Sequence, residues 1–378
     1  MFHSPWHNKF SQRAEPSELR VYSKYSRVSG GARVRVFDWL KETGTAGDVR
    51  VFATYDPENR SSRYVTDGLE YAGKQSRLLR EIREVKSARC RTLVYRQATP
   101  FGRGGIEAKL LGSASFGVFD FDDAIHLQSS AGRLGTLFPP PVRAAVSVAA
   151  ADQVIAGNEF LADWASGYST EVAVIPSCVS PENYRLKVSY ELSESPRIGW
   201  IGSHSTDRYL DKIRLPLLEL HKRTGARIAL IGSVTEHRGE LETMIDRIQW
   251  SEQTQHELLC SMDVGIMPLP DTEFARGKCA YKLLQYGAAG VPSIGSPVGA
   301  NTAVLKGMGG WAPTTDAEWL DALVEAVSTS SRRRQMIGEQ ARTFVAENYS
   351  YRTWRRRWEL LVLGRESPAT PGIDGGTL

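Results

Sequence analysis

One stretch of the sequence decides the fold class: Gly277-Lys278-Cys279-Ala280-Tyr281-Lys282-Leu283-Leu284-Gln285-Tyr286-Gly287-Ala288-Ala289-Gly290-Val291-Pro292. A glycine and a lysine open it, apolar residues at helical spacing follow, and Gly290 and Pro292 end the predicted helix. Residues 293–295 then predict a strand. The first turn of a helix has unpaired N–H groups and a partial positive charge. With a lysine beside it, this helix start is a candidate phosphate site.

Length and composition predict a soluble protein of two domains. The chain has 378 residues, which is too long for one ordinary hydrophobic core. Hydrophobic residues make up 41% and charged residues 24%, as in globular proteins. The net charge of +4 is small for this length, so it gives only weak support for binding nucleic acid or an anionic membrane. No apolar run approaches the roughly 20 residues that span a bilayer.

The four cysteines and the N-terminal residues indicate the compartment. Cys90, Cys178, Cys260 and Cys279 stand alone in the sequence, without the paired spacing of a zinc site or a disulfide framework. Residues 1–17 are polar and contain no apolar segment typical of a secretory signal. We therefore expect a cytoplasmic protein. Peripheral attachment to the inner face of a membrane is the less favoured alternative.

Short apolar runs alternate with helical patterns along most of the chain, which predicts an α/β fold with parallel sheets. The strands expected in the first half are residues 19–22, 49–53, 92–95, 115–121, 154–156 and 172–176. Those expected in the second half are residues 197–202, 227–232, 264–268 and 292–295. Two doubly wound halves in tandem place ligands in a cleft, at the carboxyl ends of the strands.

A polar segment with a proline, residues 180–195, marks the expected boundary between the two domains. We expect an N-terminal domain over residues 1–185 and a C-terminal domain over residues 196–348. Residues 349–364, which are rich in Trp, Arg and Leu, predict a final helix. The tail, residues 365–378, is rich in Pro, Gly and Thr, and we expect it to be disordered.

Several motifs occur in one order over the second half of the chain. They are Ile198-Gly199-Trp200-Ile201-Gly202-Ser203, Ile231-Gly232, Asp263-Val264-Gly265-Ile266-Met267-Pro268-Leu269-Pro270-Asp271, and the block from Gly277 to Gly299. This half resembles the donor domain of family 4 glycosyltransferases, which are retaining enzymes of the GT-B fold, in its bacterial type. The first half is more weakly similar, through residues 119–125 and 152–158.

The resemblance implies two Rossmann-like domains that face a cleft, with the C-terminal helix crossing back to the N-terminal domain. It also implies transfer of a sugar from a nucleotide-diphospho-sugar to a hydroxyl acceptor, with retention at the anomeric carbon. No metal and no cofactor are expected, so N–H groups and cations must stabilise the departing diphosphate. The donor is expected to be a UDP- or GDP-sugar.

The predicted donor site lies in the second half. Lys278 and Lys282 offer positive charge, and the helix start near Cys279 and Ala280 offers backbone N–H groups. The alternative is that each lysine is a solvated charge on the surface of a helix, with no ligand. The remaining donor candidates are the loop residues Gly202, Ser203 and Arg208, and Trp250, which the resemblance places near the base and which could equally belong to the core.

This sequence departs from the family at two glutamates that stand eight positions apart. Gly277 and Gln285 occupy the matching positions. The second glutamate usually binds the ribose hydroxyls, and Gln285 keeps an acceptor oxygen for that role. The first usually contacts the sugar, which the side chain of Gly277 cannot do. We keep Gly277 in the predicted donor site by its position, and propose that Glu273 or Asp271 substitutes for the lost carboxylate.

The predicted acceptor site lies in the first half. Asp120, Asp122 and Asp123 follow an apolar strand, and three neighbouring carboxylates need a cationic or hydroxyl-rich partner. By resemblance, Asp122 and Asp123 are the catalytic candidates with Lys278, and Asp120 is an acceptor ligand. The alternatives are that one of them caps a helix, or that the three hold a metal, which the family pattern argues against.

Three further residues are acceptor candidates with strong alternatives. His126 follows the aspartates, and it is more often a packing or surface histidine than a base. Gly30 and Gly31 lie between the first strand and the first helix, where glycines let the backbone approach a ligand closely or simply form a turn.

Partners and rival functions remain to be separated. The acceptor is a glycan, a lipid-linked sugar or a small natural product, and no basic-aromatic motif predicts nucleic-acid binding. Residues 355–357 are three arginines, which indicate either a solvated helix face or, less favoured, contact with anionic lipid. The rival functions are a sugar-nucleotide epimerase or phosphorylase of the same fold, and a degenerate, non-catalytic glycosyltransferase.

Overall fold

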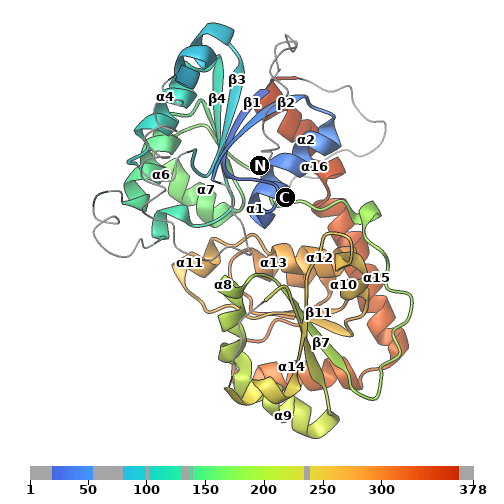
Figure 1. The fold of residues 1–378 in the computed structure, drawn as a ribbon. Helices are drawn as coiled ribbons and strands as arrows, with labels where there is room; N and C mark the ends of the chain where they lie inside the picture. The colour runs from blue at the N-terminus through green and yellow to red at the C-terminus, as the bar shows by residue number, and fades with distance from the viewer. Residues whose placement is uncertain are drawn as a thin grey trace, which may run out of the picture.

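Two parallel β-sheets, each covered by helices, form the framework of the protein (Figure 1). The structure is a computed structural model, and it describes residues 19–53, 80–98, 102–128, 137, 139–233 and 239–365. The two sheets lie one above the other, and the first half of the chain forms the upper unit in Figure 1. This arrangement confirms the predicted fold class of two α/β units.

The first sheet has six strands in the order β2-β1-β3-β4-β5-β6. Its strands are β1 (Leu19–Tyr25), β2 (Gly47–Ala53), β3 (Arg91–Tyr95), β4 (Phe116–Phe121), β5 (Gln153–Ala156) and β6 (Val172–Val174). The helical elements between them are α1 (Gly30–Ala32), a π-helical turn (Arg33–Phe37), α2 (Asp38–Thr43), residues 80–88, α4 (Gly105–Ser113), a 3-10 turn (Ile125–Leu127), α6 (Pro140–Ala149) and α7 (Glu159–Ser166). Every strand pairs parallel to its neighbours, so all carboxyl ends meet at one edge.

The second sheet has five parallel strands in the order β11-β10-β7-β8-β9. Its strands are β7 (Arg197–Ile201), β8 (Arg227–Ile231), β9 (Ile245–Ile248), β10 (Val264–Met267) and β11 (Ser293–Gly295). Its helical elements are α8 (His204–Asp207), α9 (Arg214–Thr224), α10 (Gln255–Cys260), α11 (Glu273–Arg276), α12 (Tyr281–Ala288), α13 (Ala300–Met308), α14 (Asp316–Ser328) and α15 (Ser331–Asn348), with 3-10 turns at Pro181–Asn183, Arg208–Ile213 and Gly239–Met244.

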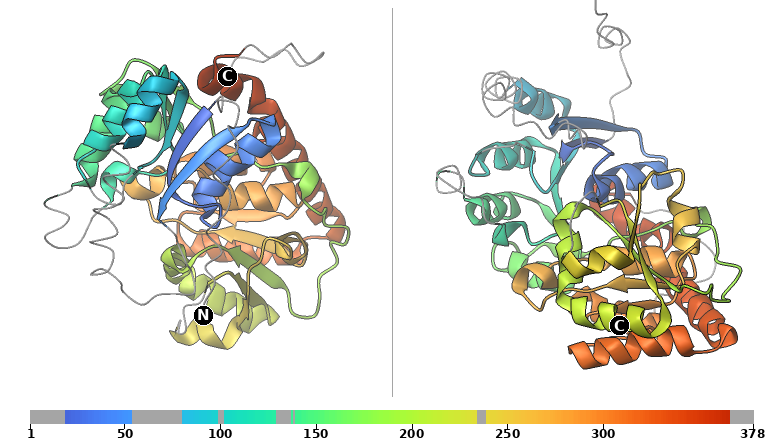
Figure 2. Two further views of the ribbon diagram at one scale, coloured as in Figure 1. Left: turned by 45° about the horizontal axis from the view of Figure 1, so that its top comes forward. Right: turned by 60° about the horizontal axis from the view of Figure 1, so that its bottom comes forward.

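The chain returns to the first unit through α16 (Tyr351–Trp358) and a π-helical turn (Glu359–Leu363). Figures 1 and 2 show these segments in red, beside the blue first strands and helices. The buried ring of Trp358 stacks on Trp39 at 5.2 Å between centroids, and the hydroxyl of Tyr351 donates to the carbonyl of Val34 at 2.9 Å. The aromatic residues thus anchor the helix, which confirms the predicted crossing.

The two connections between the units run side by side. The N–H of Val179 donates to the carbonyl of Tyr349 at 2.9 Å, and the N–H of Tyr351 donates to the carbonyl of Val179 at 3.1 Å. This short parallel bridge is where both chain segments leave one unit for the other. It joins the two units at one side of the space between the sheets.

The sequence analysis did not predict β9, a short strand at the edge of the second sheet. The expected disordered tail lies outside the described residues except for residue 365. None of the helices in the described ranges is long and apolar enough to cross a bilayer.

Candidate active site

The start of α12 forms the C-terminal half of the site. Ala280 precedes the helix in the left-handed conformation, with φ 53°, which is uncommon for a residue with a side chain. Strain of this kind is retained where the surrounding structure enforces it. The left-handed conformation of Ala280 turns the chain from the loop at Gly277 directly into α12. The N–H groups of the first turn of α12 are left for a partner outside the helix.

Lys282 lies across Gly202, at the end of β7. A Cβ atom added to Gly202 would lie 2.8 Å from Cε and 3.1 Å from Nζ of Lys282, so this glycine allows the close approach. The ammonium group sits 5.0 Å from the centre of the Trp200 ring. Burial, and secondarily the charge of Lys278, lower the pKa of Lys282 to about 8. Among the described residues no carboxylate pairs with Lys282, so its charge lacks a partner.

Lys278 reaches from the second unit toward the first. Its Nζ lies 3.7 Å from Oδ1 of Asp123 and 4.8 Å from the centre of the Phe274 ring. Lys278 is close enough to Lys282 for its charge to disfavour the protonated form of Lys282. The two predicted lysines and the predicted Asp123 therefore come together, from opposite sides of the space between the units.

The carboxyl ends of β3 and β4 form the N-terminal half of the site. Asp122 accepts hydrogen bonds from the hydroxyl of Tyr95 at 2.7 Å and from Nε of Arg96 at 2.8 Å. Nη2 of Arg96 lies 3.7 Å from Oδ2 of Asp123. Burial alone would raise the pKa of Asp122, but Arg96 and Arg35 outweigh it and hold the pKa below its ordinary value. Asp122 is therefore ionised at neutral pH.

Arg96 is a site residue that the sequence analysis missed. It has φ 58°, so a second left-handed residue stands across the cleft from Ala280. Arg96 belongs to no recognisable sequence motif. Only the fold, which brings the ends of β3 and β4 together, places Arg96 beside the aspartates. Gly31 lies against the same pair: an added Cβ would be 2.5 Å from the Tyr95 hydroxyl oxygen and 3.3 Å from Nη2 of Arg96. Gly30 has no atom within 4 Å of such a Cβ, which fits a plain helix start.

Asp120 differs from its two neighbours, because its side chain is fully buried. Its two carboxylate oxygens accept from Nε and Nη2 of Arg35 at 2.9 and 2.7 Å, and Arg35 is also fully buried. Burial alone would lower the pKa of the Arg35 guanidinium, but Asp120 outweighs it and the net pKa is raised. This is a structural ion pair. The predicted acceptor contact of Asp120 is corrected accordingly, since the carboxylate is closed off from the cleft.

The loop before α12 is docked on the first unit. Nδ2 of Asn158 donates to the carbonyls of Arg276 at 3.3 Å and Lys278 at 3.1 Å, and the thiol of Cys279 donates to the carbonyl of Asp122 at 3.3 Å. A Cβ added to Gly277 would lie 2.7 Å from Cβ of Ala124. Gly277 and Cys279 therefore make contacts between the units in this structure, and the donor contacts predicted for their positions stay predictions.

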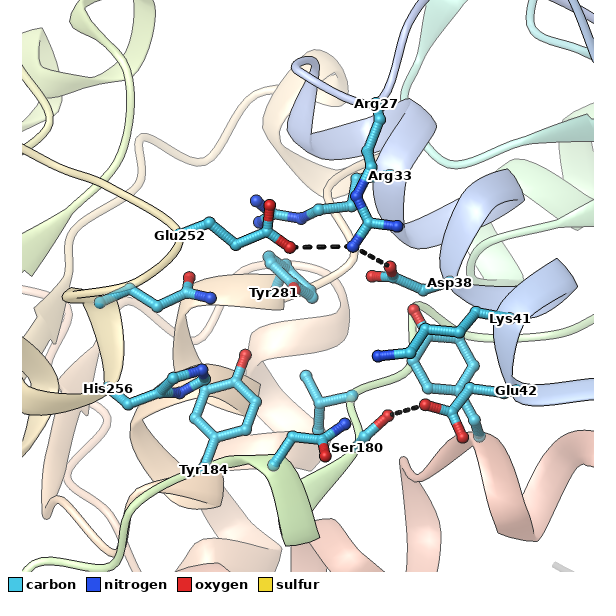
Figure 3. Close-up of a pocket in the computed structure, with 14 residues that line it drawn as sticks. Arg27, Arg33, Asp38, Lys41, Glu42, Ser180, Tyr184, Glu252, His256 and Tyr281 are labelled. Atoms are coloured by element: carbon cyan, nitrogen blue, oxygen red, sulfur yellow. Dashed lines mark hydrogen bonds and ion pairs between the residues drawn. The ribbon is translucent and has the colours of Figure 1, made fainter.

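A cavity of about 140 Å³ lies between the units near their two connections (Figure 3). Figure 3 shows Arg33, Tyr281 and Tyr184 around it, and an ion pair from Arg27 to Glu252, 2.8 Å long, that joins the units. The guanidinium of Arg33 lies 5.2 Å from the centre of the Trp250 ring. Trp250 is half-buried, and the base contact expected at its loop stays a prediction.

The remaining residues predicted for the donor site are Gln285, Ser203 and Arg208. Gln285 is buried one turn after Tyr281 and interacts with the hydroxyl of Tyr184. Ser203 caps α8 next to Gly202. Arg208 is exposed, and its guanidinium lies 5.5 Å from the centre of the Tyr209 ring.

His126 and Glu273 line a second groove whose lining does not include Lys278 or Lys282, and the role of Glu273 as a substitute for the sugar-binding carboxylate stays a prediction. The other suggested substitute, Asp271, is exposed and paired with Arg276 at 2.7 Å. Among the described residues, no three histidine, cysteine or acidic side chains gather closely enough to hold a metal ion.

Comparison with solved structures identifies the architecture. The chain matches HepE from Anabaena in complex with UDP and glucose with a TM-score of 0.65 and 13% identity, over 90% of this chain and 98% of that one. It matches sucrose-phosphate synthase from Thermosynechococcus elongatus with a TM-score of 0.62 and 12% identity, over 92% and 96%. The fold is GT-B.

A third GT-B match is a UDP-forming trehalose-phosphate synthase from Burkholderia xenovorans, with a TM-score of 0.62, 16% identity and coverage of 93% of this chain and 100% of that one. Models of protein families and the sequences of curated proteins give no match. The structural match establishes the GT-B fold. Because the sequence identities are this low, the match does not establish the activity, which follows from the site.

Proposed function

We propose that this protein is a glycosyltransferase that takes its sugar from a nucleotide-diphospho-sugar. The observation that carries the proposal is Lys282, a half-buried lysine in the first turn of α12 without a carboxylate partner among the described residues, which lies over Gly202. A desolvated cation is costly unless an anion joins it. A helix start, a glycine turn and an unpaired ammonium group together suit a diphosphate.

The proposed reaction needs stabilisation of the leaving group more than a strong base. The bond between the anomeric carbon and the diphosphate oxygen breaks, and the electron pair leaves with the nucleoside diphosphate. Lys278, Lys282 and the first N–H groups of α12 stabilise that charge. The acceptor hydroxyl oxygen forms the new bond to the anomeric carbon, and its proton passes to an oxygen of the departing phosphate. The positive charge comes from protein groups, so we propose that the reaction is independent of metal.

Retention of configuration is the stereochemistry that this arrangement favours. We propose that the acceptor approaches from the side of the leaving group, where a phosphate oxygen can receive its proton. Asp122 is held ionised by Arg96 and Tyr95, and Asp123 faces Lys278. We propose that both aspartates accept hydrogen bonds from hydroxyl groups of the transferred sugar or of the acceptor.

Uridine is the nucleoside that we propose first. HepE was solved with UDP and glucose, and the trehalose-phosphate synthase is described as UDP-forming. In this chain Trp250 contacts Arg33, and Arg33 interacts with Tyr281. The buried Gln285 interacts with Tyr184, which also interacts with Tyr281. We propose that the base and the ribose bind beside these residues. GDP is the comparison ligand, because the resemblance allows either base.

The test is nucleotide binding and turnover in matched lysine variants. We expect UDP to bind the wild type and raise its melting temperature, and a panel of UDP-sugars to show slow hydrolysis or transfer. Lys282→Gln should weaken UDP binding at least tenfold, whereas Lys306→Gln, on the exposed face of α13, should leave it unchanged. Equal UDP affinity in the Lys282→Gln variant and the wild type would refute the proposed donor site.

A non-catalytic GT-B protein is the second candidate, and one observation favours it. Gly277 stands where related enzymes have a sugar-contacting glutamate, and here that position is filled by Ala124 of the other unit. Such a protein would bind UDP without turning over any UDP-sugar. UDP affinity together with a complete absence of hydrolysis and transfer, across the panel of donors, would favour this candidate over the enzyme.

A further inference from the structure

A groove of about 530 Å³ opens at the edge of the cleft, on the side away from the cavity near the connections. Helices α6 and α7 of the first unit form its wall, and α11 of the second unit closes it from below (Figure 1). None of its lining residues takes part in the proposed donor chemistry. They are His126, Leu127, Pro141, Phe160, Asp163, Trp164, Tyr168 and Glu273.

Aromatic rings form the floor of this groove. Trp164 stacks on His126, with ring centroids 4.1 Å apart and planes at 5°, and it also contacts Tyr168 at 5.2 Å between centroids. Tyr168, which directly follows the C-cap residue Gly167 of α7, is 48% exposed. Exposed rings that are held in fixed orientations offer a flat apolar surface to a ligand.

Polar groups border the aromatic floor. Asp163 and Glu273 supply carboxylates from opposite units, and both are exposed. His126 is only 7% exposed, and its Nδ1 is buried with no hydrogen-bond partner among the described residues. Burial lowers the pKa of His126, so the imidazole is neutral at physiological pH and can donate or accept at this atom.

The groove is next to the reaction centre. The helix α11 carries Glu273 into the groove and Phe274 beneath the ammonium group of Lys278, 4.8 Å from the ring centre. His126 and Leu127 follow Asp122 and Asp123 in the chain by only a few residues. An acceptor whose reactive hydroxyl is at Asp123 and Lys278 would therefore extend its next part into this groove.

From these observations we infer that the groove is an acceptor subsite for a neutral saccharide ring, which stacks on Trp164 and Tyr168 and donates its hydroxyls to Asp163 and Glu273. This inference rests on the proposed function and specifies its acceptor class. One face of a sugar ring is lined by C–H groups and packs on aromatic rings, while its edge hydroxyls seek carboxylates. Two carboxylates at the border disfavour an anionic ligand, and they would lie unpaired beside a lipid chain.

The experiment is a binding measurement by saturation-transfer NMR and titration, on the full-length protein with UDP present. The probes are the methyl glycosides of glucose, galactose, mannose and N-acetylglucosamine, and their disaccharides, with 1-octanol as an apolar probe. We expect at least one saccharide to bind, with the strongest transfer to the ring protons of one face. Tyr168→Ala should weaken that binding by about threefold to tenfold, the effect of losing one stacked ring.

Matched variants keep the test sharp. Tyr168→Phe keeps the ring and should bind as the wild type does. Asp163→Asn should weaken saccharide binding, whereas Asp321→Asn on the exposed face of α14 should not. The inference is overturned if no saccharide binds, if Tyr168→Ala and Asp163→Asn bind saccharide as the wild type does, or if only 1-octanol binds. UDP affinity in the same samples reports separately on the donor site, so failure of one proposal is distinguishable from failure of the other.

Discussion

Lys282 has a pKa of about 8, because burial and the charge of Lys278 both oppose its protonation. A bound diphosphate favours the charged form and raises this pKa, so UDP binding and protonation of Lys282 support each other. Below about pH 8 the amine is already charged and UDP affinity is at its maximum. We predict that affinity falls as the pH rises above this point, by up to about tenfold per pH unit.

Isothermal titration with UDP across the alkaline range checks this prediction. The Lys282→Gln variant should bind weakly and show a flat profile over the same range, because it has lost the titrating group. A wild-type affinity that stays constant through pH 8 and above would mean that the diphosphate does not contact this amine.

The ion pair of Arg35 and Asp120 makes a prediction about stability. Both side chains are fully buried, and removing one partner leaves an uncompensated charge. Arg35→Met should therefore lower the free energy of unfolding by about 3–5 kcal/mol. The double variant Arg35→Met with Asp120→Leu should recover much of this loss, and denaturant unfolding measures both. Equal losses in the single and double variants would show that the pair is not what stabilises this region.

Gly277 makes a prediction that runs against the family pattern. Restoring a glutamate at this position should damage the protein, because the new Cβ would lie 2.7 Å from Cβ of Ala124 and 3.2 Å from Cδ2 of Leu161. We expect Gly277→Glu and Gly277→Ala both to separate the units, seen as a larger radius of gyration and lower turnover. Gly112→Ala, where an added Cβ meets no atom within 4 Å, is the control. A more active and equally compact Gly277→Glu variant would contradict this prediction.

At the scale of elements, α7 and the loop before α12 are joined by Asn158. Its Oδ1 accepts from the N–H of Leu161 at 3.0 Å and caps α7, while its Nδ2 donates to the loop carbonyls. Asn158→Asp keeps the cap and loses the donors. We predict that the Asn158→Asp variant has a melting temperature close to that of the wild type and a lower kcat/KM. Asn158→Ala removes both the cap and the donors, so both its melting temperature and its kcat/KM should fall. Unchanged kcat/KM in Asn158→Asp would show that the docked loop has no functional role.

The elements themselves were largely predictable, and the contacts between them were not. Buried parallel strands are short apolar runs, so β1, β3, β4, β7, β8 and β10 stand out in the sequence. β9 reads Ile245-Asp246-Arg247-Ile248, and its central residues are charged because it lies at the edge of the sheet. Its apolar signal is too weak to separate it from a loop.

Some residues of the candidate site could be predicted from the sequence, and others could not. Lys278 and Lys282 were predictable because a glycine-lysine start before a helix has a local physical meaning. Arg96, Asn158 and the role of Gly277 depend on residues more than 25 positions away, which sequence spacing does not reveal. Asp120 and Asp122 are only two positions apart, but β4 ends at Phe121. Asp120, inside the strand, pairs with Arg35, whereas Asp122, beyond its end, pairs with Arg96.

At the scale of the whole molecule, the GT-B architecture explains why the site is divided. Each unit supplies its own strand ends, and α16 fastens the second unit to the first through Trp358 and Tyr351. The cations Lys278 and Lys282 belong to one unit, and Asp122 and Asp123 to the other. These four side chains therefore meet only when the units are together, and in the proposed reaction this closure would exclude water from the donor.

The central claim is that a diphosphate binds at the start of α12 against Lys282, and a crystal structure of the protein with UDP tests it most directly. We predict that phosphate oxygens lie within hydrogen-bond distance of Nζ of Lys282 and of the backbone N–H groups in the first turn of α12. UDP bound anywhere else, or phosphates held without contact to this lysine and this helix start, would contradict the account.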